Sequence, residues 1–184
     1  QPTAPSFQRL EIKELAHPAL LRYLQERGID AAIARNECRE LHFTHNGKPY
    51  FAIGFPNVAG GYEVRNPFFK ACIAPKEITH IQKGNGRNYV CYLFEGFMDY
   101  LSFLTIYKRN KPHSPDLTDK DCIILNSVSN IGKAMSRLDG YGRIHCFFDN
   151  DTAGRTAYRE MEQAFPCKVR DASTYYSEYK DLND

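Results

Sequence analysis

Two acidic motifs, each directly after an apolar stretch, constrain the fold of this chain more than any other feature. The first is Glu95-Gly96-Phe97-Met98-Asp99, which follows residues 92–94, and the second is Asp149-Asn150-Asp151, which follows residues 144–148. Each pattern predicts a strand, then carboxylates, then the start of a helix. Because the carboxyl ends of parallel strands meet at one edge of an open sheet, we expect these carboxylates to gather at that edge.

The acidic side chains predict a metal site. Carboxylates that converge repel one another unless a cation lies between them. Residues two apart in an extended segment point to the same side, so Asp149 and Asp151 can share one metal region. Hard oxygen ligands suit Mg²⁺ or Mn²⁺. We therefore expect Glu95, Asp149 and Asp151 to form a Mg²⁺ or Mn²⁺ site for phosphate chemistry.

Two further residues, one beside each acidic motif, have both a functional and a plainer interpretation. Residues 152–155 begin a helix, whose N-terminal amides favour a phosphate, and Arg155 lies one turn inside it as a candidate phosphate contact. The plainer alternative is a capped helix start with a solvated Arg155. Asp99 either belongs to the nucleotide-binding site or only complements the dipole of its helix.

Composition places the chain among ordinary water-soluble proteins. Its 184 residues are 25% charged with a net charge of +2, which is compatible with nucleic acid but does not require it. No apolar run approaches the roughly 18 residues that cross a membrane. Six scattered cysteines without a CxxC pair predict reduced thiols and a cytoplasmic protein. The chain starts at Gln1 rather than Met, so we expect a fragment or a processed product.

The pattern of residues 1–76 predicts a small α+β subdomain, in which residues 1–9 are expected to be a disordered N-terminal segment. Pro18 and Gly28 bound a short helix, and a second helical turn is expected over residues 30–36. The Asn46-Gly47 pair between apolar runs is typical of a β-hairpin. A further strand is expected at residues 62–65.

Residues 77–184 alternate strand and helix patterns, which predicts a parallel sheet with right-handed crossovers. Strands are expected at residues 78–82, 89–94, 121–125, 143–148 and 167–170, and helices at 97–109, 130–138 and 152–164.

Basic residues outside the acidic motifs are candidate nucleic-acid or nucleotide contacts. Arg65 and Lys70 lie among aromatic residues and are candidates for phosphate contacts, whereas Phe68 and Phe69 are expected to cover the small sheet. Lys83 and Arg87 bound a basic glycine-rich turn, which is either a phosphate-contacting loop or a plain solvated turn.

The last residues, Tyr179-Lys180-Asp181-Leu182-Asn183-Asp184, supply a third acidic cluster near the same sheet edge. Asp181 is a candidate metal ligand and Lys180 a candidate phosphate contact. The alternative is a frayed polar terminus. The tyrosines at 175, 176 and 179 either stack on bases or latch the terminus to the sheet.

This combination resembles the Toprim domain of bacterial primases, topoisomerases and some nucleases. A Glu after one strand (Glu95) and a DxD after a later one (Asp149 and Asp151) are the marks of that domain. The segments at 95–99, 149–155 and 180–183 are similar to the EGxxD, DxDxAGR and KDxD elements of bacterial and phage primases, although Asn183 replaces the last acid. Residues 23–29 are similar to the segment that opens the primase catalytic core.

The resemblance implies a Toprim-type, Rossmann-like parallel sheet with flanking helices over residues 77–184, preceded by the small α+β subdomain. It implies a DNA primase-like nucleotidyltransferase that makes short RNA primers on a single-stranded DNA template from nucleoside triphosphates. Asp149, Asp151 and Asp181 would hold Mg²⁺ or Mn²⁺, and Glu95 would bind metal or act as the general base. A replicative helicase is a candidate partner, and no membrane is expected.

Two alternatives remain open at this point. A Toprim metal site also supports a nuclease that hydrolyses phosphodiesters. Asn183 motivates a third interpretation, a non-catalytic nucleic-acid-binding replication module. Primases also carry an N-terminal zinc-binding module that is absent here, so the resemblance leaves open whether this fragment is active alone.

Overall fold

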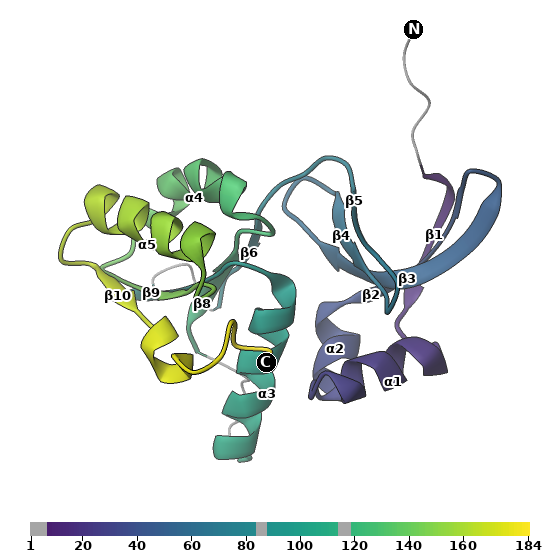
Figure 1. Cartoon of the computed structure of the whole chain (residues 1–184), viewed down its shortest axis with the longest axis horizontal. Coiled ribbons are helices and arrows are strands. Elements are labelled where there is room, and N and C mark those ends of the chain that lie inside the picture. Colours follow the sequence, from purple (N-terminus) through teal and green to yellow (C-terminus); the bar gives the residue numbers. More distant parts are fainter. Residues whose placement is uncertain (1–6, 84–87, 114–118) are drawn as a thin grey trace, which may run out of the picture. The chain divides into compact units, whose positions relative to one another are not determined.

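The computed structural model describes residues 7–83, 88–113 and 119–184. The chain divides into two compact units, Gln1–Lys76 and Glu77–Asp184. Figure 1 shows both, the first in purple and blue and the second in teal to yellow.

The first unit is an antiparallel sheet of five strands in the order β1-β2-β3-β4-β5 with two helices (Figure 1). The expected hairpin is present, with His45 paired to Lys48 and positive φ angles of 49° and 74° at Asn46 and Gly47. Its elements are β1 (Gln8–Glu14), α1 (Pro18–Glu26), α2 (Ala31–Glu37), β2 (Arg39–His45), β3 (Lys48–Pro56), β4 (Tyr62–Arg65) and β5 (Lys70–Ile73).

Local chemistry explains where the helices of this unit begin and end. The His17 side chain accepts a hydrogen bond from the Ala19 amide before α1, and Pro18 occupies the first turn. Gly28, with a φ of 73°, follows α1 in the left-handed region that glycine adopts most readily. Asp30 caps α2 by accepting hydrogen bonds from two of its backbone amides.

Two expectations for this unit were wrong. The disordered N-terminal segment does not extend to residue 9, because β1 begins at Gln8 and the Phe7 ring packs 5.0 Å from the Phe43 ring. Residues 1–6 lie outside the described residues. Phe68 does not cover the sheet, since it is 90% exposed, whereas Phe69 packs against the small core as expected.

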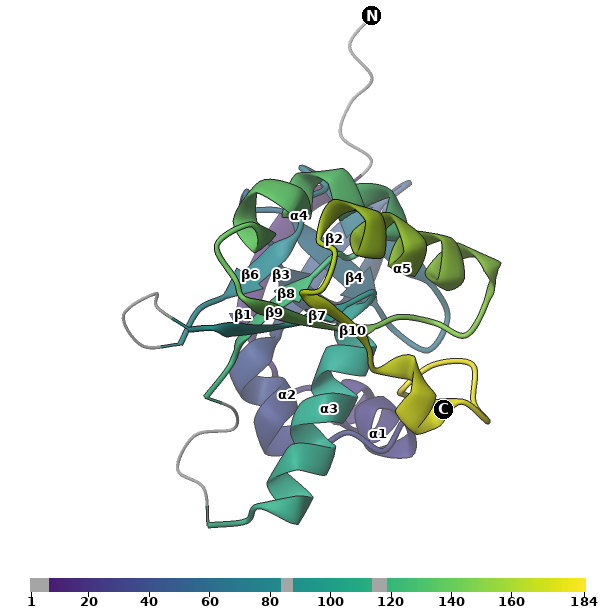
Figure 2. The same ribbon diagram turned by 90° about the vertical axis from the view of Figure 1, so that its left-hand side faces the viewer.

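The second unit is a five-stranded sheet in the order β10-β9-β7-β8-β6. Figure 2 shows α3 on one face of this sheet and α4 and α5 on the other. The sheet is parallel except for β6, which pairs antiparallel with β8. The elements are β6 (Thr79–Ile81), β7 (Val90–Phe94), α3 (Phe97–Asn110), β8 (Asp121–Ile124), α4 (Ile131–Leu138), β9 (Arg143–Phe147), α5 (Thr152–Ala164) and β10 (Val169–Asp171), with short 3-10 helices at Val128–Asn130 and Ser173–Tyr176.

Both faces of this sheet are covered by apolar packing, which fixes its central strands. Leu93 and Cys146 belong to the core under α4 and α5, and all six cysteines are free, as predicted. On the α3 face, the Phe94 and Phe147 rings stack 4.8 Å apart and Phe103 of α3 packs against both. Because β7 and β9 are neighbours, the residues that follow them emerge side by side.

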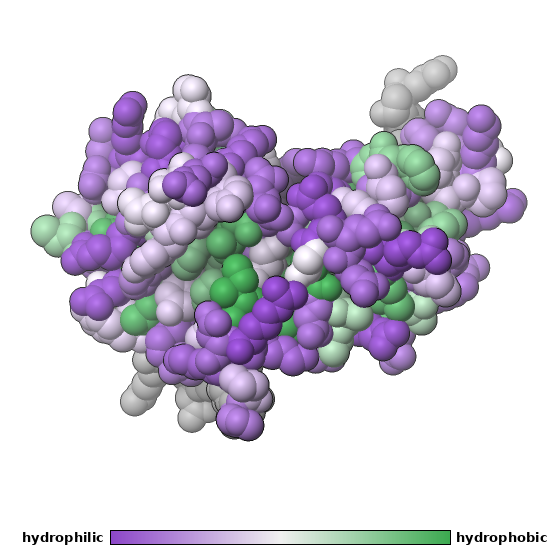
Figure 3. Space-filling model, turned by 60° about the horizontal axis from the view of Figure 1, so that its bottom comes forward, coloured by the Kyte–Doolittle hydropathy of each residue, from purple (hydrophilic) through white to green (hydrophobic). Residues whose placement is uncertain are grey.

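The face of the molecule shown in Figure 3 is mostly hydrophilic, and its hydrophobic residues lie in separate patches. In the described parts of the chain, no helix is both long enough and apolar enough to span a membrane.

Candidate active site

Glu95 and Asp149 meet at the carboxyl edge of the second sheet. Glu95 directly follows β7, and its amide donates to the Phe147 carbonyl at the end of β9 at 3.4 Å. The Asp149 amide in turn donates to Oε2 of Glu95 at 3.1 Å. The structure thus brings together the carboxylates of the two motifs, although they are 54 residues apart in sequence.

The second motif folds as a tight turn into α5. Asp151 caps this helix, since its Oδ1 accepts from the Gly154 amide at 2.9 Å. A Cβ atom on Gly154 would lie 2.1 Å from the carbonyl oxygen of Asp149, so a side chain cannot be accommodated there. The glycine therefore allows the backbone of the motif to pack onto the first turn of α5.

The C-terminal segment folds back over this edge and is not frayed. The Asn150 amide donates to the Lys180 carbonyl at 2.6 Å, and Asn183 Nδ2 donates to Ser102 Oγ of α3 at 2.7 Å. Lys180 Nζ lies 3.9 Å from Asp149 Oδ2 and 4.0 Å from Asp151 Oδ2. The segment therefore delivers a cation to the two aspartates of the DxD motif.

Asp99 is buried in the first turn of α3, with 7% of its surface exposed. Burial and the charges of Asp181, Asp149 and Glu95 raise the pKa of Asp99 well above its ordinary value, and a hydrogen bond from the Asn183 backbone lowers it in part. Asp99 is thus electrostatically part of the acidic cluster.

The cluster carries more negative charge than its surroundings neutralise. Burial and the charges of Glu95, Asp181 and Asp151 raise the pKa of Asp149 to about 7. Burial likewise raises the pKa of Glu95, although the Asp149 amide opposes this. Such mutual repulsion is the condition that a divalent cation relieves.

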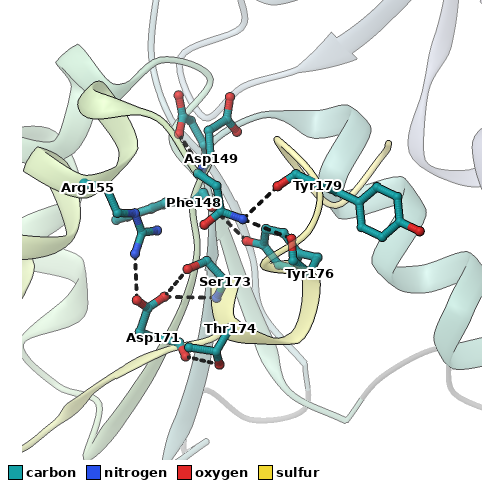
Figure 4. Close-up of polar contacts among 10 residues, drawn as sticks. Phe148, Asp149, Arg155, Asp171, Ser173, Thr174, Tyr176 and Tyr179 are labelled. Carbon is teal, nitrogen blue, oxygen red and sulfur yellow. Dashed lines mark hydrogen bonds and ion pairs between the residues drawn. The ribbon is translucent and has the colours of Figure 1, made fainter.

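Arg155 is paired within the protein instead of being solvated. Its Nη1 donates to Asp171 Oδ2 at 2.6 Å, and Asp171 Oδ1 accepts from both the amide and the hydroxyl of Ser173 (Figure 4). Its Nε and Nη2 atoms are buried and have no hydrogen-bond partner among the described residues. Asp171 thus fixes the guanidinium while two donor positions remain unused.

Of the other predicted basic residues, two belong to the first unit, and Lys83 lies away from this edge. Arg65 belongs to the first unit, where its Nε donates to the Tyr23 hydroxyl at 3.2 Å, and Lys70 is its partner across β4 and β5. The Lys83 amide donates to Asp121, which begins β8 and so lies at the opposite end of the strands. Arg87 lies outside the described residues.

Sequence reasoning missed two polar residues of this region. Asp171 ends β10, so the signal that singled out Glu95 and Asp149, a carboxylate after a strand, also applies to it. Asn150 bonds to the C-terminal segment through both its backbone and its side chain. Its position inside the DxD motif was the available signal.

The donor chemistry of the cluster fits Mg²⁺ or Mn²⁺, because hard carboxylate oxygens carry excess negative charge there. Within residues 7–83, 88–113 and 119–184, however, no three His, Cys, Asp or Glu side chains are already arranged to hold one ion. A metal would therefore require the carboxylates to close further around it.

Comparison with solved structures supports the fold. The chain resembles the primase fragment of the bacteriophage T7 primase-helicase protein, with a TM-score of 0.57 at 20% identity over 86% of this chain. It also resembles a chain in the structure of the bacteriophage T7 lagging-strand DNA polymerase interacting with primase domains of two gp4 subunits, which are bound to an RNA/DNA hybrid and dTTP. The TM-score is 0.56 at 17% identity, and the match covers 96% of this chain. The match to the Aquifex aeolicus primase, in a structure of its zinc-binding and RNA polymerase domains, has a TM-score of 0.53 at 14% identity and covers 86% of this chain.

The chain spans 66%, 85% and 50% of the length of these three matched chains, respectively. No curated protein matches it by sequence. Residues 9–74 match a domain of unknown function, DUF8464. Residues 92–184, half of the chain, match the Toprim-like family, and on this ground the chain belongs to that family.

Proposed function

We propose that this chain is the catalytic core of a DNA primase-like nucleotidyltransferase, which makes short RNA primers on single-stranded DNA. The observation that carries the proposal is the extent of the structural likeness. The match to the T7 primase fragment covers 86% of the chain and therefore extends from the Toprim unit into the first unit. A Toprim nuclease would need to share only the second unit.

The proposed ligands of Mg²⁺ or Mn²⁺ are four carboxylates, those of Glu95, Asp149, Asp151 and Asp181. When bound, the ions would neutralise the triphosphate and activate the attacking 3′-hydroxyl. The raised pKa values of Asp149 and Glu95 support this, because burial and then the neighbouring carboxylates disfavour the ionised forms, which a bound cation would favour. Asp99 lies on the buried side of the cluster, where burial and the same carboxylates raise its pKa.

Glu95 has two proposed roles, metal ligand and general base. Its Oε2 is already engaged by the Asp149 amide, which fixes the carboxylate at the sheet edge. Burial raises its pKa, which is the direction that a general base requires. A Glu95→Asp variant, which shortens the side chain but keeps the charge, separates these roles through its pH–rate profile.

The cations around the cluster are proposed to position phosphates. Lys180 has an exposed side chain within ion-pair distance of Asp149 and Asp151. Arg155 is fixed by Asp171 through Nη1, and its side chain, which is 31% exposed, is proposed to contact a phosphate. In the first unit, Arg65 and Lys70 are proposed to contact the nucleic-acid backbone, as are Lys83 and Arg87 in the second.

The proposed substrates are a single-stranded DNA template and nucleoside triphosphates. This is supported by the T7 structure, in which primase domains are bound to an RNA/DNA hybrid and dTTP. Protein cations would hold the backbone while base pairing selects the sequence. A replicative helicase is proposed as a partner, and the cytoplasm is proposed as the location that goes with a replication role.

One gel tests the proposal. The whole protein that carries this chain is incubated with labelled single-stranded DNA and Mg²⁺ or Mn²⁺, with and without ribonucleotides. A Glu95→Gln variant is compared with a Glu160→Gln control, whose exposed side chain lies on α5 outside the site. Short RNA products that vanish only in Glu95→Gln support a primase. Shortened DNA without ribonucleotides contradicts the proposal and favours a nuclease, and DNA binding without either product favours a non-catalytic module.

A further inference from the structure

Asn150, between the two aspartates of the DxD motif, makes three hydrogen bonds to the C-terminal segment. Its Nδ2 donates to the carbonyl of Tyr176 at 3.0 Å and to the carbonyl of Tyr179 at 2.9 Å (Figure 4). Its backbone amide donates to the Lys180 carbonyl at 2.6 Å. A primary amide has two N–H donors, and Asn150 uses both on backbone carbonyls of this one segment.

We name residues 176–183 the C-terminal strap. After Tyr176 the strap contains neither helix nor strand, so its position depends on individual contacts. Its first residue is held by the Tyr176 hydroxyl, which donates to the Phe148 carbonyl at 2.9 Å, and its last by Asn183, which donates to Ser102 at 2.7 Å. Asn150 holds the part between these two ends.

That middle part carries the groups that face the acidic cluster. Lys180 reaches both aspartates of the DxD motif, and Asp181 influences the charge of Asp149 and Asp99. The Asn150 side chain donates to the carbonyls of Tyr176 and Tyr179, and its backbone amide donates to the carbonyl of Lys180 itself. A shift of the strap at this point would therefore move Lys180 and Asp181 together.

We propose that Asn150 is a positioning residue, which acts through the strap by holding Asp181 and Lys180 against the DxD motif. This inference rests on the proposed function in so far as it makes the placed group a metal ligand. The side-chain chemistry is specific. An aspartate at 150 has no donor for the two carbonyls and adds a negative charge to the cluster, while a leucine has nearly the same shape and no donor.

Hydrogen exchange tests the positioning role directly. In Asn150→Leu, amides of residues 177–184 should exchange about tenfold faster or more, because both side-chain hydrogen bonds to the strap are lost. Amides of β7 and β9 should keep their protection, which shows within the same experiment that the variant is folded. Asn150→Asp should free the strap at least as much. Tyr179→Phe is the matched control, because it leaves the backbone carbonyl in place and should not change exchange.

Binding of Mn²⁺ alone, measured by electron paramagnetic resonance, tests what the strap is for. Affinity should fall about 10-fold or more in Asn150→Leu, the range typical of residues that orient metal ligands. If Asn150 acts through Asp181, the double variant Asn150→Leu/Asp181→Asn should bind Mn²⁺ no more weakly than Asp181→Asn alone.

The two measurements separate this inference from the proposed function. Unchanged exchange in Asn150→Leu overturns the positioning role, whatever the enzyme does. A freed strap with unchanged Mn²⁺ affinity, or additive losses in the double variant, overturns the action through Asp181. A freed strap and non-additive loss of Mn²⁺ binding support the inference even in a protein that makes no primers.

Discussion

The backbone amide of Asp149 donates a 3.1 Å hydrogen bond to Oε2 of Glu95, which joins the ends of two neighbouring parallel strands. This bond favours the ionised form of Glu95, while burial and, after it, the charge of Glu95 raise the pKa of Asp149. The same pair is thus held together by the backbone and driven apart by its charges. A cation bound between the two carboxylates would relieve this repulsion.

The stability of the metal-free protein should report the cost of ionising Asp149 in this partly buried, acidic site. The pKa of Asp149 in the folded state is about 7, against 3.8 for an unperturbed carboxyl, so the folded state is weakened where Asp149 is ionised. The penalty is complete above about pH 7 and disappears as the pH falls toward 4. A neutral amide at this position carries no such penalty. We therefore expect Asp149→Asn to raise the melting temperature by a few degrees, of order 3 °C, at pH 8 and to leave it unchanged at pH 4.5.

Calorimetry in a chelating buffer measures this difference, and Mg²⁺ or Mn²⁺ at millimolar concentration should reduce it. The same variant should lose all metal-dependent activity while its circular dichroism stays that of the wild type. Equal melting temperatures at pH 8, or full activity in Asp149→Asn, would contradict the electrostatic interpretation of the cluster.

Gly154 should tolerate no side chain. A Cβ atom there would lie 2.1 Å from the Asp149 carbonyl oxygen, and that oxygen is backbone and cannot rotate away. Gly154→Ala should therefore destabilise the protein by about 3 kcal/mol and abolish activity by displacing α5 from the DxD motif. Gly132 of α4 is the matched control, since nothing lies within 4 Å of its Cβ position. Gly132→Ala should stabilise by up to about 1 kcal/mol in the same urea titration.

Much of the second unit was predictable because its signals are local. The apolar stretches before Glu95 and Asp149, and the helix starts after them, lie within a few residues of each other in sequence. The antiparallel direction of β6 was not predictable in this way. It is fixed by the pairing of β6 with β8, which lies about forty residues further along the chain. Strand β1 was missed because every residue of Gln8–Glu14 is exposed, so no buried face marks it.

The partners of the polar site residues were not predictable, because they come from distant parts of the chain. Arg155 was expected to be solvated or to bind phosphate, and its partner Asp171 lies 16 residues away on another element. The carbonyls that Asn150 contacts lie 26 and 29 residues further on. Residue type showed that each of these side chains needs a partner, and only the tertiary structure identifies which one.

Arg155 should couple to Asp171 in both stability and substrate binding. The 2.6 Å contact to a half-buried carboxylate fixes the guanidinium, and a lysine offers one point charge in place of the planar donors. Arg155→Lys should raise KM for the nucleotide about tenfold with a smaller change in kcat, if the partly exposed Arg155 side chain binds its phosphates. Steady-state kinetics measures this, and a loss of stability with unchanged KM would make Arg155 purely structural.

Asp121 should be the main electrostatic anchor at the opposite end of the second sheet. It is 1% exposed and accepts hydrogen bonds from the Lys83 amide, Asn88 Nδ2 and the Tyr141 hydroxyl at 2.7, 2.6 and 2.6 Å. Burial opposes its ionisation, but these bonds outweigh burial and lower its pKa, so its stabilisation is present above the unperturbed value of 3.8 and is lost as the pH falls through the folded pKa. Asp121→Asn should cost about 2–3 kcal/mol at pH 7 in urea unfolding, because the amide cannot accept all three bonds. The difference from the wild type should narrow below about pH 4.

Asp119→Asn, at an exposed position, should change stability by less than about 0.5 kcal/mol. Mn²⁺ affinity should stay at the wild-type value in Asp121→Asn, because Asp121 begins β8 whereas the acidic cluster follows β7 and β9; a fall in that affinity would contradict the separation of the two ends.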